Sequence, residues 1–514
     1  MKNRLKNQNS LIFSRKDIRQ IEKRGLKLSD LERQLALYRK GPRYIHLNRP
    51  CVLHDGIISV SPAQRKRWIA LYEKKSVEYR FVKFIPASGA ASRMFAEWFN
   101  VMDDQGFGSA QRNQLFLRSL KKQPFYSFIQ RDARIYQHVR QKNIKNILDY
   151  ILSPEGLNYG RLPKALIHFH SYGQEDVRTA LEEHLMEGAH YVRSRNNICH
   201  LHFTVSPEHK KNIVKKIKET QPFYENLYQI KYKISLSDQS PSTDILAVDE
   251  NNLPIRDNRG NLVFRPGGHG TLLDNLQQLD ADFIFVKNID NIAPARLLEA
   301  IIPYKKIMGG LAVGLQEEIF SAIQQLKKSK ITASQIESIV SFCSEKLNIV
   351  FPHDFDGQSH RDKKNYLVSK LNRPLRVCAM VKNEGEPGGG PFWVKEKDGT
   401  QSLQIVEKIH VEQNNPEQVS LWEKAQFFNP VDMICCLKDY RGQKFKLADY
   451  VDHNAYLISR KHEKGRMINA LEVPGLWNGA MAKWNTVFVK APLIVFNPVK
   501  TIDDLLRPEH QMTD

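Results

Sequence analysis

The stretch Arg80-Phe-Val-Lys-Phe-Ile-Pro-Ala-Ser-Gly-Ala-Ala-Ser-Arg-Met-Phe95 decides the fold class of this chain. It begins with a short apolar run, 81–85, whose composition is typical of a buried strand. A loop of small residues follows, and the pattern after the loop is helical. Strand, small-residue loop and helix in this order are the start of a βα unit.

Similar apolar runs recur on both sides of this unit. Strand candidates lie at 165–169, 200–205, 231–236, 283–286, 375–381, 403–406, 433–437 and 486–489, and helical patterns separate several of them. Alternation of this kind predicts an α/β fold with a mixed, mainly parallel sheet. We expect a helical N-terminal region over 1–80, the α/β domain over 81–437 and an α+β C-terminal extension over 438–514.

Composition narrows the class of protein and of partner. The 514 residues are 41% hydrophobic and 10% aromatic, too rich in both for a disordered chain. The 77 Lys and Arg outnumber the 56 Asp and Glu, which gives a net charge of +21 and favours anionic partners: nucleic acid, an anionic membrane or phosphorylated ligands. There is no 18-residue apolar stretch, no signal-peptide core and no CxxC pair among the six cysteines. We therefore expect a cytoplasmic protein without a membrane span.

The loop after the first strand has the features of a phosphate site. Small side chains at Ala87, Ser88 and Gly89 let backbone N–H groups approach an anion, and Arg93 offers a guanidinium fork. No G-x-x-x-x-G-K-[ST] sequence is present, so the loop is not a Walker loop. An ordinary tight turn is the alternative interpretation.

Three charged residues occupy positions near predicted strand ends or helix starts. Lys164 precedes a predicted strand, Asp290 follows the strand 283–286 within Asn-Ile-Asp-Asn, and Lys500 precedes a predicted helix. Ligands of parallel sheets bind at the carboxyl ends of strands, where one carboxylate can hold Mg²⁺ beside phosphates. A surface lysine and a polar turn are the alternatives for Lys164 and Asp290.

Two further segments suit ligand binding. Gln239 can pair with the edge of a base through its amide, and Gly268 and His269 lie in the glycine-rich run Pro266-Gly-Gly-His-Gly270. Gly389 and Glu407 belong to a glycine turn and to the strand that follows it. Each is also compatible with an ordinary polar or glycine-rich loop.

The histidines suggest a rival, metal-dependent function. The pairs His168/His170 and His200/His202 have a spacing of two, which places each pair on one face of a predicted strand. If the two strands were neighbours, four imidazoles would converge on a transition metal.

Taken in order, these segments resemble the UDP-sugar pyrophosphorylases, a family of nucleotidyltransferases. The matching islands are Asp238-Gln-Ser, Pro266-Gly-Gly-His-Gly, Asn288-Ile-Asp-Asn, Gly388-Gly-Gly with Ile405-Val-Glu, Asn478-Gly-Ala-Met and Pro498-Val-Lys-Thr-Ile-Asp-Asp-Leu-Leu. The whole chain also resembles the bacterial domain-of-unknown-function 4301 family, through phrases such as Gly385-Glu-Pro-Gly-Gly-Gly-Pro-Phe and Pro474-Gly-Leu-Trp-Asn-Gly-Ala-Met. That second resemblance implies no activity.

The first resemblance implies a Rossmann-like nucleotidyltransferase fold and a reaction. A nucleotidyl group passes from a nucleoside triphosphate, with UTP favoured, to a sugar 1-phosphate, and pyrophosphate leaves. It implies catalytic roles for Arg93, Lys164 and Lys500, with Mg²⁺ on Asp290. The nucleotide and sugar positions it implies are Ala87, Ser88, Gly89, Gln239, Gly268, His269, Gly389 and Glu407.

One departure from that family keeps other functions open. The family's first loop is dense in glycine, whereas this one carries alanines, which restrict positive φ. A nucleotide- or sugar-binding protein without turnover is therefore the first alternative. A nucleic-acid-binding or metal-dependent protein is the second, although no nucleic-acid module is recognisable.

Overall fold

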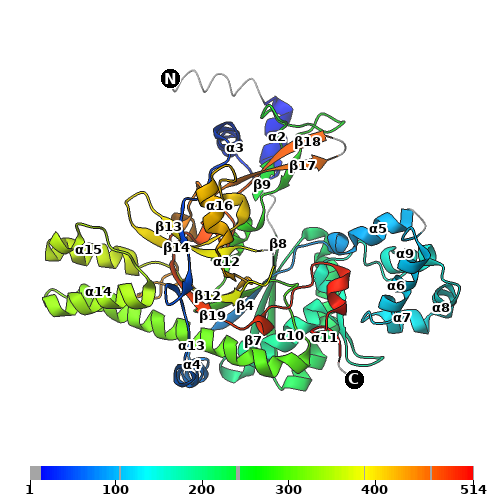
Figure 1. Cartoon of the computed structure of the whole chain (residues 1–514), viewed down its shortest axis with the longest axis horizontal. Helices are drawn as coiled ribbons and strands as arrows, with labels where there is room; N and C mark the ends of the chain where they lie inside the picture. Colours follow the sequence, from blue (N-terminus) through cyan, green and yellow to red (C-terminus); the bar gives the residue numbers. More distant parts are fainter. Residues whose placement is uncertain (1–12, 104–105, 239–242, 387, 464–465, 513–514) are drawn as a thin grey trace.

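The computed structural model describes residues 13–103, 106–238, 243–386, 388–463 and 466–512. Its centre is a ten-stranded sheet (Figure 1). The strands, in spatial order, are β2 (Val52–Leu53), β3 (Gly56–Ile58), β19 (Asn485–Lys490), β12 (Leu375–Lys382), β16 (Asp432–Cys436), β11 (Phe283–Lys287), β4 (Phe81–Pro86), β7 (Ile198–Val205) and β8 (Lys231–Asp238), with β15 (Phe427–Phe428) paired to β12.

The sheet is mixed and mainly parallel, as the sequence predicts. Strand β16 runs antiparallel to both of its neighbours, β11 and β12, and β15 is antiparallel to β12; the other neighbouring pairs are parallel. The sheet takes strands from all three of the predicted regions, since β2 and β3 precede residue 81 and β19 follows residue 437. The prediction of a helical N-terminal region over 1–80 is wrong in one respect: 47–58 contain the short strands β1, β2 and β3 rather than helix.

Smaller sheets surround this centre. They are formed by β1 (Leu47–Pro50) with β13 (Gly390–Lys395) and β14 (Gln401–Val406), by β5 (His168–Ser171) with β6 (Val177–Thr179), by β9 (Asp244–Leu246) with β10 (Phe264–Pro266), and by β17 (Leu457–Glu463) with β18 (Arg466–Glu472).

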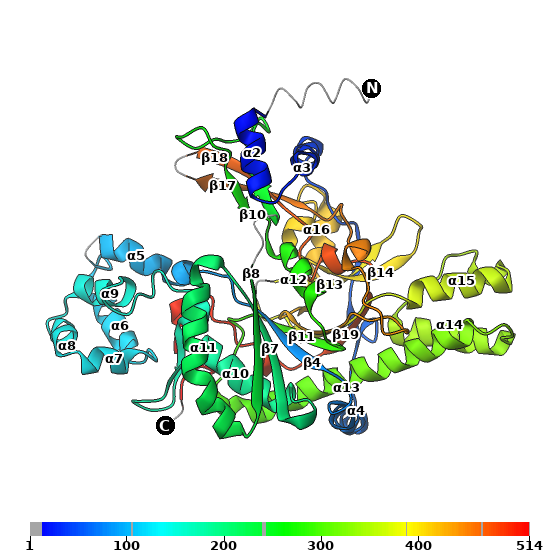
Figure 2. The ribbon, with the colours of Figure 1, turned by 180° about the vertical axis from the view of Figure 1, so that it is seen from behind.

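Helices cover both faces of the central sheet. Over the described residues the helices are α2 (Arg15–Lys23), α3 (Leu28–Lys40), α4 (Pro62–Lys75), α5 (Ala96–Asp103), α6 (Ala110–Leu120), α7 (Tyr126–Arg131), α8 (Ala133–Arg140), α9 (Ile144–Leu152), α10 (Ala180–Tyr191), α11 (Pro207–Tyr228), α12 (Leu272–Gln278), α13 (Ala295–Leu326), α14 (Ala333–Leu347), α15 (His360–Leu371) and α16 (Pro416–Glu423). Helices α10 and α13 lie on one side and α12 on the other, while α5–α9 and α14–α15 project at opposite ends (Figures 1 and 2).

The two faces of the inner strands follow the alternation of their apolar residues. Phe81 and Phe285 point into the larger core with α10 and α13, whereas Phe84 and Ile284 point into the core with α12. Strands that are buried on both faces are expected in a parallel sheet covered by helices. Over the described residues, no helix is long and apolar enough to cross a membrane.

Candidate functional site

Asp290 lies at the carboxyl end of β11, where two lysines from distant parts of the chain meet it. Lys164 Nζ donates to Asp290 Oδ2 at 3.0 Å, and Lys500 Nζ donates to the same oxygen at 2.9 Å. Because β4 and β11 are parallel neighbours, the loop after β4 begins beside Asp290. The adjacent Ile289 N–H donates to Pro86 O at 3.2 Å. The predicted Lys164, Asp290 and Lys500 therefore form one cluster.

Backbone contacts hold the two lysine-bearing segments in place. Lys164 N–H donates to Gly89 O at 3.2 Å, which ties this lysine to the small-residue loop. Val499 N–H donates to Asp290 O at 2.9 Å and its carbonyl accepts from Lys164 Nζ at 2.9 Å. Lys500 N–H donates to Asp504 Oδ2 at 2.7 Å. The C-terminal segment thus completes the cluster by pairing with the end of β11.

The charges of this cluster are unevenly exposed. Burial would raise the pKa of Asp290, but the ammonium groups of Lys500 and Lys164 outweigh it and hold that pKa below its usual value. Asp290 Oδ1 is buried and has no hydrogen-bond partner among the described residues. The Lys500 side chain is 54% exposed, against 11% for Asp290. Asp290 Oδ1 can therefore accept a cation, and the Lys500 ammonium can bind an anion.

The small-residue loop is open toward solvent. Ala87 N–H donates to Thr204 O at 2.9 Å, but in the described part of the chain the amides of Ser88 and Gly89 donate to no acceptor. None of 87–92 adopts a positive φ, so the alanines fit this loop without strain. Arg93 is exposed in a 3₁₀ turn, Ala91–Phe95, and its guanidinium has no ion pair with a described residue. Ser88 and Gly89 can receive an anion; the structure does not tie Arg93 to Asp290.

A second cluster contains His269 and Glu407. His269 Nδ1 accepts from Leu476 N–H at 3.0 Å, and the ring stacks on Trp477 with centroids 4.0 Å apart. Glu407 Oε1 lies 4.0 Å from His269 Nε2 and accepts from Asn478 Nδ2 at 2.8 Å. Since Nδ1 is an acceptor here, the proton of a neutral ring lies on Nε2 and faces Glu407. Burial lowers the pKa of His269 despite the nearby carboxylates.

The remaining predicted residues of this region surround the second cluster. Gly268 has φ +83°, a conformation that favours glycine, and precedes His269. A Cβ on Gly389 would lie 3.4 Å from Glu407 Cγ. Gln239 lies outside the described residues.

One loop connects the two clusters. Asn291, next to Asp290, donates through Nδ2 to Pro430 O at 3.4 Å, and Asn429 N–H donates to Gly389 O at 2.8 Å. The first cluster lies at the edge of the central sheet at which β4 and β11 end, the edge where α/β folds place their ligands. The second cluster is linked to it through the 429–430 loop and Gly389.

The two histidine pairs do not converge. His168 and His170 lie on β5, in a two-stranded sheet, whereas His200 and His202 lie on β7 in the central sheet. His170 Nε2 is 2.9 Å from His510 Nδ1, and His202 is hydrogen-bonded to Ser235 and Ser237. Across the described ranges, no group of three or more His, Cys, Asp or Glu is arranged to hold a metal ion.

The family follows from the whole sequence. The model of Domain of unknown function (DUF4301) matches residues 14–511. The chain belongs to the DUF4301 family. No curated protein is significantly similar to it in sequence.

Solved structures similar to this DUF4301 chain include UDP-sugar pyrophosphorylases. The uridine diphosphate N-acetylglucosamine pyrophosphorylase from Trypanosoma brucei is 12% identical, with a TM-score of 0.46 over 89% of this chain and 72% of that one. The UDP-glucose phosphorylase from Trypanosoma brucei is 13% identical, with a TM-score of 0.45 over 96% of this chain and 80% of that one. The UDP-glucose pyrophosphorylase from Leishmania major is 12% identical, with a TM-score of 0.42 over 93% and 74%.

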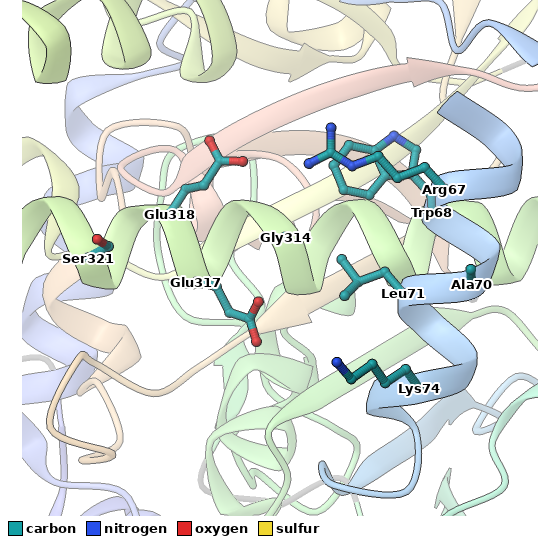
Figure 3. Close-up of a pocket in the computed structure, with 9 residues that line it drawn as sticks. All are labelled: Arg67, Trp68, Ala70, Leu71, Lys74, Gly314, Glu317, Glu318 and Ser321. Atoms are coloured by element: carbon teal, nitrogen blue, oxygen red, sulfur yellow. The ribbon is translucent and has the colours of Figure 1, made fainter. Parts of the chain in front are cut away.

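Trp477 and Asn478 belong to the second cluster of the DUF4301 chain, although they were not among the residues predicted from the sequence. Their signal was an aromatic and an amide inside the glycine-rich run 474–479, but only the fold brings them to His269 and Glu407. A separate open pocket of about 580 Å³ lies between α4 and α13, lined by Trp68, Leu71 and Glu317 among others (Figure 3). It contains no residue of either cluster.

Proposed function

We propose that this protein transfers a nucleotidyl group from a nucleoside triphosphate, UTP by preference, to a sugar 1-phosphate and releases pyrophosphate. The observation that carries the proposal is the meeting of Lys164 and Lys500 on Asp290, beside the amides of Ser88 and Gly89, which donate to no acceptor among the described residues. Two ammonium groups and open amides at the carboxyl edge of a parallel sheet suit a ligand with several phosphates.

The proposed reaction asks for alignment and positive charge. A sugar 1-phosphate oxygen attacks the α-phosphorus in line, and pyrophosphate departs from the opposite side. The attacking oxygen is already ionised, so no general base is needed. Lys164 and Lys500 would offset the charge that develops on the phosphates, and Arg93 is close enough in sequence to the loop to join them once substrate binds. His269 would serve as a neutral Nε2–H donor rather than as a base.

Mg²⁺ is the ion that this reaction implies, and Asp290 suits it. The buried Oδ1 of Asp290 lacks a hydrogen-bond partner among the described residues, so one carboxylate oxygen is left for a cation. Mg²⁺ commonly binds through one or two carboxylates together with substrate phosphates. When bound, it would neutralise phosphate charge.

The second cluster would hold the part of the substrate that does not react. Glu407 and Asn478 offer an acceptor and an amide for hydroxyl groups, and the stacked His269 and Trp477 form a flat wall. Gly268 is half-buried beside this wall, whereas Gly389 is buried and packs closely against Ile405 and Glu407. We place the nucleoside and the sugar at this cluster.

Binding without turnover is the second candidate function, and one contact favours it. The amide of Ala87 is already bonded to Thr204, so the loop offers an anion fewer N–H groups than a fully open loop would. With this function, the protein would bind a nucleotide and release no pyrophosphate.

The test is pyrophosphate release with Mg²⁺ over a matrix of nucleoside triphosphates and sugar 1-phosphates. We expect a signal that is lost in Lys500→Ala and in Asp290→Asn and kept in Lys490→Ala. Lys490 is the matched control because it is exposed at the end of β19, outside both clusters. Silence across the matrix, with UTP binding detected by calorimetry, would replace this proposal with the binding function.

A further inference from the structure

Arg376 is a buried cation that neither cluster includes. It lies on β12, its side chain is 0% exposed, and it is among the largest fully buried side chains. In the described part of the chain no carboxylate lies within ion-pairing distance of its guanidinium. Its Nη2 is buried without a hydrogen-bond partner there, and burial lowers its pKa. A charge placed in a core without a counter-ion is costly, so a structural core alone does not account for it.

The contacts of Arg376 lead to the second cluster. Nε donates to Thr486 Oγ1 at 2.9 Å on the neighbouring strand β19, and Nη1 donates to Trp477 O at 2.6 Å. A short hydrogen bond from a charged donor is a strong one. It fixes the peptide between Trp477 and Asn478, the residues that contact His269 and Glu407.

We infer that Arg376 is a positioning residue: through the Trp477 carbonyl it orients the Pro474–Asn478 loop over the His269–Glu407 cluster. The central sheet supplies the fixed end of this connection, since Arg376 and Thr486 face each other in the β12–β19 register. Naming the loop's ligand as a sugar 1-phosphate or nucleotide rests on the proposed function, but the orienting role does not.

The experiment measures hydrogen exchange of backbone amides by mass spectrometry in Arg376→Met and in the wild-type chain. The informative amides are those of 476–481, where Leu476 N–H donates to His269 and Ala480 N–H donates to Gly475 O. We expect them to exchange at least tenfold faster in Arg376→Met, while β12 and β19 change less than twofold. Thr486→Val removes the strand-side anchor and leaves the bond to Trp477 O, so it should speed loop exchange by less than Arg376→Met does.

The kinetic arm applies once turnover is established. There Arg376→Met should raise the KM for the sugar 1-phosphate at least tenfold and leave kcat within threefold, since the reacting groups are at the other cluster. If the wild-type chain shows no turnover, the proposed function fails while hydrogen exchange still decides the role of Arg376.

Two results would overturn the inference. The first is that the amides of 476–481 exchange in Arg376→Met at the same rate as in the wild-type chain. The second is that protection is lost equally in the loop, β12 and β19, which would make Arg376 only a core residue. If Arg376→Met does not fold, the same exchange measurement is made on Arg376→Lys. Lysine keeps the charge, but its single side-chain nitrogen cannot replace the separate nitrogens that bond to Thr486 and Trp477. Unchanged loop exchange in that variant would overturn the inference equally.

Discussion

Lysines pair with Asp290, which follows β11, and with two buried carboxylates, Glu187 and Asp432, but the surroundings of these ion pairs differ. At the edge, Asp290 accepts from Lys164 and from Lys500, whose side chain is 54% exposed. Beneath the sheet, Glu187 Oε2 accepts from Lys287 Nζ at 2.7 Å and Glu187 Oε1 lies 3.3 Å from Lys83 Nζ, and all three side chains are 0–1% exposed. Nearby, Lys305 pairs with Asp432, also fully buried.

This difference in exposure shows which ion pairs can contact a ligand. The buried group, which we call the core network (Lys83, Glu187, Lys287, Lys305 and Asp432), has no access to a ligand, so its charges can only hold strands and helices together. The edge group includes the exposed ammonium of Lys500, so it can bind a phosphate. Exposure, rather than residue type, separates a structural pair from a candidate site.

The largest effect is expected in the core network. Asp432→Asn leaves Lys305 buried without its counter-charge, and we expect the free energy of unfolding to fall by about 3–5 kcal/mol. Glu73→Gln is the matched control, because Glu73 pairs with the adjacent Lys306 at a half-exposed site and should cost no more than about 1 kcal/mol. Urea denaturation of both variants measures this, and equal losses would contradict the contrast.

The next effect concerns the edge group and reverses the pattern. Lys500→Ala should lower kcat by about 10²–10³-fold, the scale for removing one group that stabilises developing charge. Because Lys500 is half-exposed, the free energy of unfolding should change by no more than about 1 kcal/mol. Steady-state kinetics and urea denaturation of the same preparation test this. A large stability loss with retained turnover would assign Lys500 to the structure instead.

A smaller effect distinguishes the core network through pH. Burial lowers the pKa of Lys83 to about 7 in the folded chain, against 10.5 for an unperturbed lysine. Between these values the unfolded chain binds a proton that the folded chain has released, so stability should rise with pH from about 7 toward 10. Lys83→Met should flatten that rise, and Lys490→Met should keep it. Unfolding free energies at pH 7, 8 and 9 provide the measurement; a rise that persists in Lys83→Met would rule out this lysine as its source.

The smallest effect on stability is expected at Gly89. A Cβ built there has no heavy atom within 4 Å, so Gly89→Ala should change the free energy of unfolding by less than about 0.5 kcal/mol. The added methyl would occupy the proposed phosphate path and raise the KM for the nucleoside triphosphate. Gly270→Ala provides the contrast, because its Cβ would lie 2.0 Å from Pro474 O and must disturb the fold. An unchanged KM in Gly89→Ala would move the phosphate path away from this loop.

Much of the fold could be predicted from local pattern. The mainly apolar runs at 81–85, 283–286 and 375–381 became β4, β11 and β12, because short segments rich in apolar residues bury well on both faces of a sheet. The strands β2 and β3 were not predicted, since two or three residues carry no readable alternation. The run at 165–169 became a 3₁₀ turn followed by β5, because periodicity cannot distinguish such short elements.

The site was predictable only as separate residues. From the sequence alone, Lys164 was compatible with a surface lysine and Asp290 with a polar turn. In the structure, the backbone of Ala90 pairs with that of Pro163, and Asn291 pairs with Pro498. Those two backbone pairings bring three remote segments to one carboxylate. The histidine pairs show the converse, since equal spacing along the chain left them on different sheets.

The fold class, the basic charge and the residue types available at strand ends can be read locally, because they depend on composition and on contacts between near neighbours in the chain. Which charges meet depends on the tertiary structure. Lys500 reaches Asp290 over 210 positions and Arg376 reaches the Trp477 carbonyl over 101, and no local pattern encodes such distances. Burial was decided there too, because whether a lysine holds the core or faces a ligand depends on what packs around it.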